Sequence, residues 1–240
     1  MRAKRFLSLV LLVSLACGVT AFGQESDAGA RAAVRRGNER YARAEYEAAI
    51  EEYRRVPEGA GELYARSLYN IGVCYYELWR TEEAIVMYRR AAEAGGGRYT
   101  NALYALGVAL EDVGRPAEAK EAYTRAVAAS RGRHAPAHYR LGLLAAREGD
   151  YRAAAALFRR ANERAGGEFP SSHNNLGVML ALSGRLDEAA REFELALRQA
   201  GGTFDEAAHN LRLCRSMLAG GEKAGLASLK IAEAAAASVE

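Results

Sequence analysis

The stretch Leu-Tyr-Asn-Ile-Gly-Val-Cys-Tyr, residues 68–75, decides the fold, because shorter versions of it return later in the chain. Leu-Tyr-Ala-Leu-Gly occupies residues 103–107, and Asn-Asn-Leu-Gly occupies residues 174–177. The glycine of this stretch recurs every 35 residues, at Gly37, Gly72, Gly107, Gly142 and Gly177. Four equal intervals in succession indicate an internal repeat.

Three further columns of residues keep the same step and alternate small, large and small side chains. The first column is Ala49, Ala84, Ala119, Ala154 and Ala189. The second is Tyr53, Tyr88, Tyr123, Phe158 and Phe193, and the third is Val56, Ala91, Ala126, Ala161 and Ala196. Spacings of three and four residues place these side chains on one face of a helix. A small residue lets two helices approach while a ring fills the space beside it, so each unit is predicted to be a helical hairpin.

Glycines mark the predicted ends of these helices. The turn inside the hairpin carries Gly114, Gly149 and Gly184 in successive units, where a left-handed residue can end the first helix. A second set closes each unit, at Gly95–Gly97, Gly132, Gly166–Gly167 and Gly201–Gly202. A ring follows two residues later, at Tyr99, His134, Phe169 or Phe204, and is expected to cap the helix end.

These stretches, each followed by the alanine and ring columns, resemble tetratricopeptide repeats. The resemblance implies an all-α, right-handed α-solenoid of helix-turn-helix repeats. The repeat domain is expected over residues 24–218, with five 35-residue repeats from about residue 30 and a sixth first helix over Glu206–Leu218. Two features depart from the family pattern: its period is near 34, and glycines stand where it usually has proline at the unit boundary.

The two ends of the chain lie outside the repeats. Basic residues precede a short apolar run over residues 6–16, which is shorter than the roughly 20 residues of a membrane-spanning helix. Residues 1–23 are therefore predicted to be a cleaved signal peptide, which would make the protein periplasmic or secreted. Lipidation of Cys17, giving an outer-membrane lipoprotein, is the alternative. Residues 219–240 are alanine-rich and are expected to form a capping helix over 222–237 or a frayed tail.

Charge and cysteine content exclude several functions. Three of the 33 Lys and Arg residues lie in the predicted signal peptide, so the remainder balances the 30 Asp and Glu residues. A nearly neutral chain is a poor nucleic-acid binder, and membrane contact is expected only with lipidation. Cys74 and Cys214 lie four repeats apart and are predicted to be buried, unpaired side chains.

Motifs for catalysis are missing from the sequence. It has no phosphate-binding glycine-lysine loop, no Cys-x-x-Cys pair and no Gly-x-Ser-x-Gly turn, so no enzyme activity and no cofactor are expected. His138 and His173 are 35 residues apart, but no third ligand follows in their column. Leu68 and Leu103 hold the same column earlier, which favours packing over a metal site. Metal or small-ligand binding by the histidine pair is the alternative of another class.

The resemblance implies a concave groove lined by the first helices, in which another protein or peptide binds. Tyrosine, asparagine and arginine there would offer flat apolar area and adaptable hydrogen bonds. By register the groove residues are Asn38, Tyr41, Tyr69, Asn70, Tyr76, Tyr104, Glu111, Arg140, Arg147, Asn174 and Asn175. The expected function is that of an exported scaffold or adaptor in the assembly of an envelope or periplasmic complex, or of an envelope or pilus lipoprotein anchored at Cys17.

Overall fold

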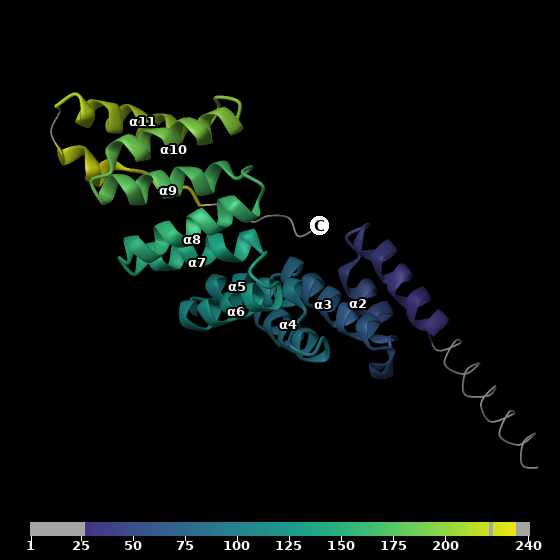
Figure 1. Ribbon diagram of the computed structural model, residues 1–240. Coiled ribbons are helices and arrows are strands. Elements are labelled where there is room, and N and C mark those ends of the chain that lie inside the picture. Colours follow the sequence, from purple (N-terminus) through teal and green to yellow (C-terminus); the bar gives the residue numbers. More distant parts are fainter. Residues whose placement is uncertain (1–26, 221–222, 234–240) are drawn as a thin grey trace, which may run out of the picture. The chain divides into compact units, whose positions relative to one another are not determined.

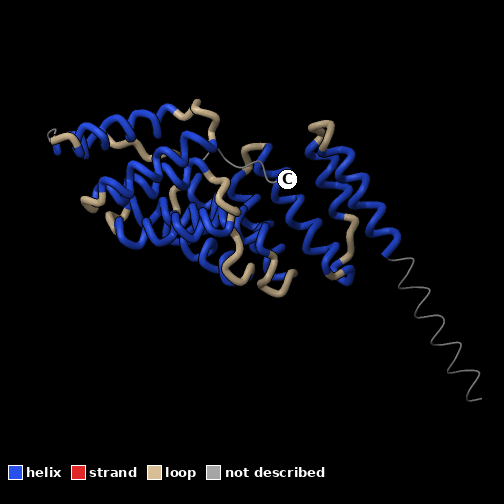
Figure 2. The backbone as a smooth tube through the Cα atoms, turned by 45° about the horizontal axis from the view of Figure 1, so that its top comes forward, coloured by secondary structure: helices blue, strands red, loops and turns tan. Residues whose placement is uncertain are grey.

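The computed structural model describes residues 27–220 and 223–233, and these residues form helices and loops without a strand (Figure 2). The predicted all-α class is therefore confirmed over this part of the chain. The predicted signal peptide, with Cys17, lies outside the described residues. Among the residues described, no helix is both long and apolar enough to cross a membrane.

The helices follow one another through short turns, as hairpin repeats require (Figure 1). The first covers residues 27–41. It is followed by α2 (Tyr46–Arg54), η1 (Glu58–Ala60), α3 (Glu62–Glu77), α4 (Thr81–Ala94), α5 (Thr100–Asp112), α6 (Pro116–Ala129), α7 (Ala135–Arg147), α8 (Tyr151–Arg164), α9 (Pro170–Leu182), α10 (Leu186–Gln199), α11 (Asp205–Leu218) and η2 (Lys223–Ser228).

The chain divides into two compact units, Met1–Arg115 and Pro116–Glu240, with the boundary between α5 and α6 of the third repeat. In unit 1, α3 packs against both α2 and α4, and α4 packs against α5. In unit 2 each helix from α6 to α11 packs against the next. Each unit is thus a stack of helical hairpins with its own core.

The repeating glycines lie where the rings of the same hairpin come closest. A Cβ atom added to Gly72 would lie 2.6 Å from Cε1 of Tyr88, and one added to Gly177 would lie 2.6 Å from Cε1 of Phe193. Gly142 stands in the same relation to Phe158, at 2.7 Å. Because real Cβ contacts are longer, only glycine allows the ring to seat against the helix. The members of the alanine column are fully buried: Ala49, Ala84, Ala119, Ala154 and Ala189. The small and large pattern of the sequence therefore packs as predicted.

The turn inside each hairpin adopts the left-handed conformation. Gly114, Gly149 and Gly184 have φ of 73°, 80° and 78°, as the glycines of the sequence predicted. The residue after each turn donates its backbone N–H to a carbonyl five residues earlier; Asp150 donates to Ala145 at 2.9 Å. In the first two repeats the same position holds Ala44 (φ 57°) and Trp79 (φ 60°). These two residues therefore adopt a left-handed backbone conformation that favours glycine.

Candidate functional site

The last described residues return along unit 2. After α11, η2 lies against that helix, and Leu226 and Leu229 pack onto the core of unit 2. Residues 229–233, here called the tail segment, are not helical and run back from α11 across α9 (yellow in Figure 1). The described part of residues 222–237 is thus neither the expected capping helix nor a frayed tail. It is a short 3-10 helix followed by an extended stretch held by side chains.

Two asparagines each pair with the whole backbone of one tail residue. The side-chain amide of Asn210 donates to the Lys230 carbonyl at 2.8 Å and accepts from the Lys230 N–H at 2.9 Å. The amide of Asn175 accepts from the Ala232 N–H at 2.7 Å and donates to the Ala232 carbonyl at 2.8 Å. An asparagine amide can do this because it carries a donor and an acceptor side by side. The bonded residues alternate along the tail, which is the period of an extended chain.

Two further side chains join these pairs into one network. The hydroxyl of Tyr139 donates to the Ala232 carbonyl at 2.6 Å and accepts from Asn175 at 3.1 Å. Asn174 donates to the Lys230 carbonyl at 3.1 Å, and its own oxygen accepts from Asn210 at 2.9 Å. We call these four residues, Tyr139, Asn174, Asn175 and Asn210, the asparagine face.

Burial makes the hydrogen bonds of the asparagine face important. All three asparagines are 0% exposed and Tyr139 is 1% exposed. Buried amides without partners cost free energy, and the tail backbone supplies those partners. Few side chains beyond Leu229 are buried. Ala232 is 5% exposed, but Lys230 is exposed and Ile231 is 41% exposed. Residues 230–233 are therefore held through their backbone and one small side chain, whereas the side chain of Leu229 packs onto the core.

Weaker contacts lie at both ends of the tail segment. Arg147 lies 3.6 Å from the carboxylate of Glu233, and both side chains are exposed, so this ion pair contributes little. Just before the other end, at the last residue of η2, the carbonyl of Ser228 lies 3.0 Å from Nε2 of His209. These contacts extend the interaction from α7 to α11.

The residues of the asparagine face form two pairs, each separated by the length of one repeat. Asn210 follows Asn175 by 35 residues, and Asn174 follows Tyr139 by the same step. Asn174, Asn175 and Arg147 are predicted groove residues, and their assignment to a groove stays a prediction. Asn210, Tyr139 and His209 were not predicted. The signal that finds them is the 35-residue step itself, applied to Asn175, Tyr104 and Asn174.

Several predicted groove residues of unit 1 have contacts within that unit. Asn38 accepts from the hydroxyl of Tyr53 at 2.8 Å and from Asn70 at 3.4 Å. The ring of Tyr41 lies 5.5 Å from that of Tyr46. Tyr76 donates to Asp112, and Glu111 is half-buried on α5. Their assignment to a groove stays a prediction, as does that of the half-buried Arg140 in unit 2.

Four of the predicted groove residues are buried, which corrects the expectation of an exposed groove lining: Asn174 and Asn175, described above, and the tyrosines Tyr69 and Tyr104. Tyr69 is 8% exposed and Tyr104 is 7% exposed. The ring of Tyr69 lies 5.7 Å from that of Tyr88 and 5.4 Å from that of Tyr99. Aromatic rings at such distances stabilise helix packing, so these tyrosines contribute to the core of unit 1.

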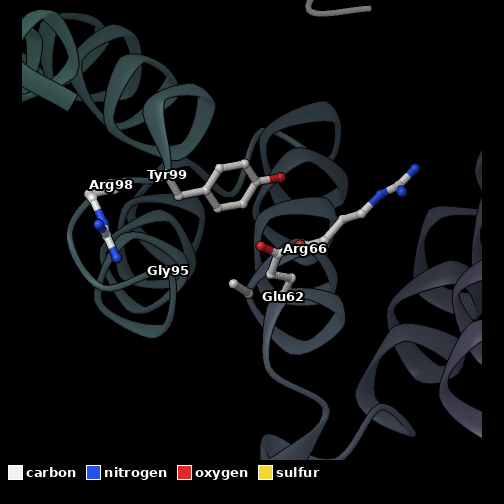
Figure 3. A pocket seen from close by; sticks show the side chains of 6 residues that line it. Glu62, Arg66, Gly95, Arg98 and Tyr99 are labelled. Atoms are coloured by element: carbon white, nitrogen blue, oxygen red, sulfur yellow. The ribbon is translucent and has the colours of Figure 1, made fainter. Parts of the chain in front are cut away.

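Unit 1 contains a hollow of about 460 Å³ beside the start of α3. Its lining includes Glu62, Arg66, Arg98 and Tyr99, and burial raises the pKa of the Tyr99 hydroxyl. Figure 3 shows the two guanidinium groups on opposite sides of the Tyr99 ring. Because these charges do not converge, the hollow lacks the arrangement of a charged-ligand site.

His138 and His173 fasten the loops between repeats. Nε2 of His138 lies 3.1 Å from the carbonyl of Gly132, and Nε2 of His173 lies 3.2 Å from that of Gly167. Burial lowers the pKa of His138, so its neutral form is favoured. Nowhere in the described ranges do three or more His, Cys, Asp or Glu side chains gather as metal ligands would. Equivalent structural contacts in two repeats explain why the pair recurs.

The repeat region is similar in sequence to a known protein family. Two family models, both described as tetratricopeptide repeat, match the chain, one over residues 29–96 and the other over residues 104–169 and 148–203. Together they cover more than half of the sequence. No curated protein is similar enough in sequence to count as a relative.

Solved structures share the fold at low sequence identity. PilF of Pseudomonas aeruginosa is 19% identical with a TM-score of 0.66, covering 85% of this chain and 90% of its own. PilW, described as a widely conserved type IV pilus biogenesis factor, is 18% identical with a TM-score of 0.60, covering 83% and 89%. YrrB, described as a repeat protein with an unusual peptide-binding site, is 23% identical with a TM-score of 0.60, covering 81% and 97%. With the repeating hairpins and both family models in agreement, the chain belongs to the tetratricopeptide-repeat family.

Proposed function

We propose that this protein is an exported scaffold that binds an extended segment of another protein along the first helices of unit 2. The observation that carries the proposal is the pairing of Asn175 and Asn210 with the complete backbone of alternate tail residues. Side chains that pair with backbone amides accept many sequences, which suits a protein that holds partners together. Proteins of this family generally act as non-enzymatic scaffolds that bind protein or peptide partners, which supports the same conclusion.

The affinity of such a site would come from several modest terms. Each hydrogen bond to the backbone contributes about 0.5–1.5 kcal/mol net, because it replaces a bond to water. Arg140 and Arg147 on α7 would add electrostatic attraction for an acidic residue of the partner. Binding would therefore be moderate and reversible, as assembly of a complex requires.

We propose further that the chain acts outside the cytoplasm, in the assembly of an envelope or periplasmic complex. Support comes from the basic residues and short apolar run at the N-terminus. The test is the N-terminal sequence of the protein recovered from the periplasmic fraction of its host. A mature N-terminus near residue 24 is expected; a chain that keeps its first residues in the cytoplasm would contradict export.

Anchoring through Cys17 is the second candidate, because this cysteine ends the apolar run. In that case the protein would be an outer-membrane lipoprotein for envelope or pilus assembly. A labelled fatty acid would then enter the wild-type chain and not the Cys17→Ala variant. Absence of label from both chains would leave the soluble exported form.

The scaffold function is tested in the native host with a photo-crosslinking amino acid in place of Arg147, which lies at the edge of the asparagine face. We expect a crosslinked partner that disappears when Asn175→Ala and Asn210→Ala are combined. Asn101→Ala, on the exposed surface of α5, is the matched control and should keep the partner. Without the crosslinker, charge reversal at Arg140 and Arg147 should weaken capture while helicity is retained. Equal crosslinking in the double variant would contradict the assignment.

A further inference from the structure

Residues 230–233 of the tail segment have the properties of a ligand that another peptide could replace. Its strongest contacts are made by backbone groups of Lys230 and Ala232, which any extended peptide could offer in the same positions. Only Ala232 is buried among residues 230–233. By contrast, Leu226 and Leu229 are packed onto the core of unit 2. The chain is thus fixed up to residue 229 and held by exchangeable hydrogen bonds beyond it.

Resting on the proposed function, we infer that residues 230–233 are a built-in competing ligand of the asparagine face. A partner peptide must displace them, and it must resemble them. It must be extended, have free N–H groups at two alternate positions, and carry a small side chain where Ala232 lies. Its direction is also set: the chain runs from α11 towards α7, because Lys230 pairs with α11 and Ala232 with α9.

The requirement for a small residue follows from burial. Ala232 is 5% exposed, and its N–H and carbonyl are both bonded to Asn175, so its backbone cannot move away from the helices without losing those bonds. A larger side chain at this position would meet the helix surface. The neighbouring Ile231 is 41% exposed, so this position should tolerate many residues.

Competition by the tail follows from its attachment. A ligand tethered by a few residues acts at an effective concentration of the order of mM. A free peptide with the same contacts therefore sees only the small fraction of molecules in which the asparagine face is open, and its apparent affinity falls by that fraction. Disabling the tail should raise the affinity for added peptide by about tenfold or more.

The experiment uses the full chain and a fluorescent synthetic peptide with the sequence of residues 230–233, acetylated at its N-terminus so that the N–H of Lys230 remains an amide. Fluorescence anisotropy compares the wild type with Ala232→Arg, in which the tail can no longer seat. Ile231→Arg is the matched control, since it places the same charge at an exposed position. We expect Ala232→Arg to bind the peptide about tenfold or more tightly than the wild type and the control. Equal affinity of all three proteins would overturn the inference.

The peptide itself tests the recognition. N-methylation at the position of Ala232 or Lys230 removes an N–H that an asparagine accepts, so binding to the Ala232→Arg protein should be lost. N-methylation at the position of Ile231 should be tolerated, because that N–H is not among the bonds to the asparagine face. Loss of binding with all three methylated peptides, or with none, would overturn the proposed register.

Amide hydrogen exchange separates this inference from the proposed function. In the wild type the N–H groups of Lys230 and Ala232 should be protected, and Asn175→Ala with Asn210→Ala should expose them while α9 stays protected. Unprotected tail amides in the wild type would overturn the inference even if the native partner still crosslinks. Protected amides without any crosslinked partner would instead contradict the scaffold function and leave the tail contact standing.

Discussion

Units 1 and 2 carry asparagine in the same column of the repeat and use it differently. In unit 1, Asn70 is half-buried and bonds to Asn38 of the preceding repeat. In unit 2, Asn175 and Asn210 are fully buried and bond to the tail segment. The column beside them differs too, with the packed ring of Tyr69 in unit 1 and the amide of Asn174 in unit 2. A repeat position therefore acquires its role from its neighbouring column and from the chain that covers it.

The largest effect should come from the packing that both units share. Phe193→Ala should lower the free energy of unfolding of unit 2 by about 3–5 kcal/mol, because the fully buried ring against Gly177 is replaced by a cavity. Urea unfolding followed by circular dichroism measures the loss. Tyr151→Ala on α8, where the ring is 42% exposed, should change stability by less than about 0.5 kcal/mol. A similar loss of unfolding free energy in both variants would show that the ring column does not stabilise the core.

The asparagine column gives the sharpest contrast between the units. Asn175→Ala should lower the free energy of unfolding by about 1–3 kcal/mol, since it leaves the backbone of Ala232 and the hydroxyl of Tyr139 without their partner. Asn70→Ala should cost less than about 0.5 kcal/mol, because its surroundings are partly solvated. Urea titrations of both variants make the comparison. An equal cost would mean that the tail segment adds nothing to the asparagine of unit 2.

The hairpin turns should respond in opposite directions. Trp79→Gly in unit 1 should raise the free energy of unfolding by about 1 kcal/mol, because it relieves a non-glycine residue at φ 60° and removes a side chain that is 92% exposed. Gly149→Ala at the equivalent turn of unit 2 should lower it by about the same amount. Thermal unfolding measures both shifts. Destabilisation by Trp79→Gly would show that the exposed ring has a stabilising contact.

The smallest effect should be a pH dependence confined to unit 2, because all four histidines of the chain lie there. Burial lowers the pKa of His138 and also that of His134. The unfolded chain then binds protons at a higher pH than the folded one, so stability falls as pH decreases below about 6.5. His138→Leu, which restores the residue type of Leu68 and Leu103, should flatten this slope in urea unfolding between pH 7 and pH 5. An unchanged slope would assign the effect to other groups.

The repeat itself was predictable from the sequence. Gly72, Tyr88 and Ala84 return at fixed intervals, and the same packing problem is solved in the same way each time. Even the missed Asn210 follows from Asn175 by one repeat step. These features are encoded locally and can be read without knowing the distant contacts.

The path of the tail segment was not predictable in this way. Its sequence, Leu-Lys-Ile-Ala-Glu, consists mostly of residues that favour a helix by intrinsic propensity. The buried amides of Asn175 and Asn210 favour an extended backbone instead, because a helix uses its own N–H and carbonyl groups internally. Contacts between residues 210 and 230 occur once and leave no period in the sequence. Tertiary hydrogen bonding therefore prevails over local preference.

The pairing of one asparagine per repeat with every second residue of the bound chain works as a ruler. Moving from α11 to α9 advances the recognised backbone from Lys230 to Ala232, so one repeat measures two ligand residues. Arg140 occupies the equivalent position of the preceding repeat, 35 residues before Asn175. Arg140→Asn would add a third asparagine that can pair with the ligand backbone. Duplication of the α9–α10 hairpin would lengthen the binding surface by one repeat. The length of ligand that this protein binds is therefore set by the number of repeats that carry the asparagine.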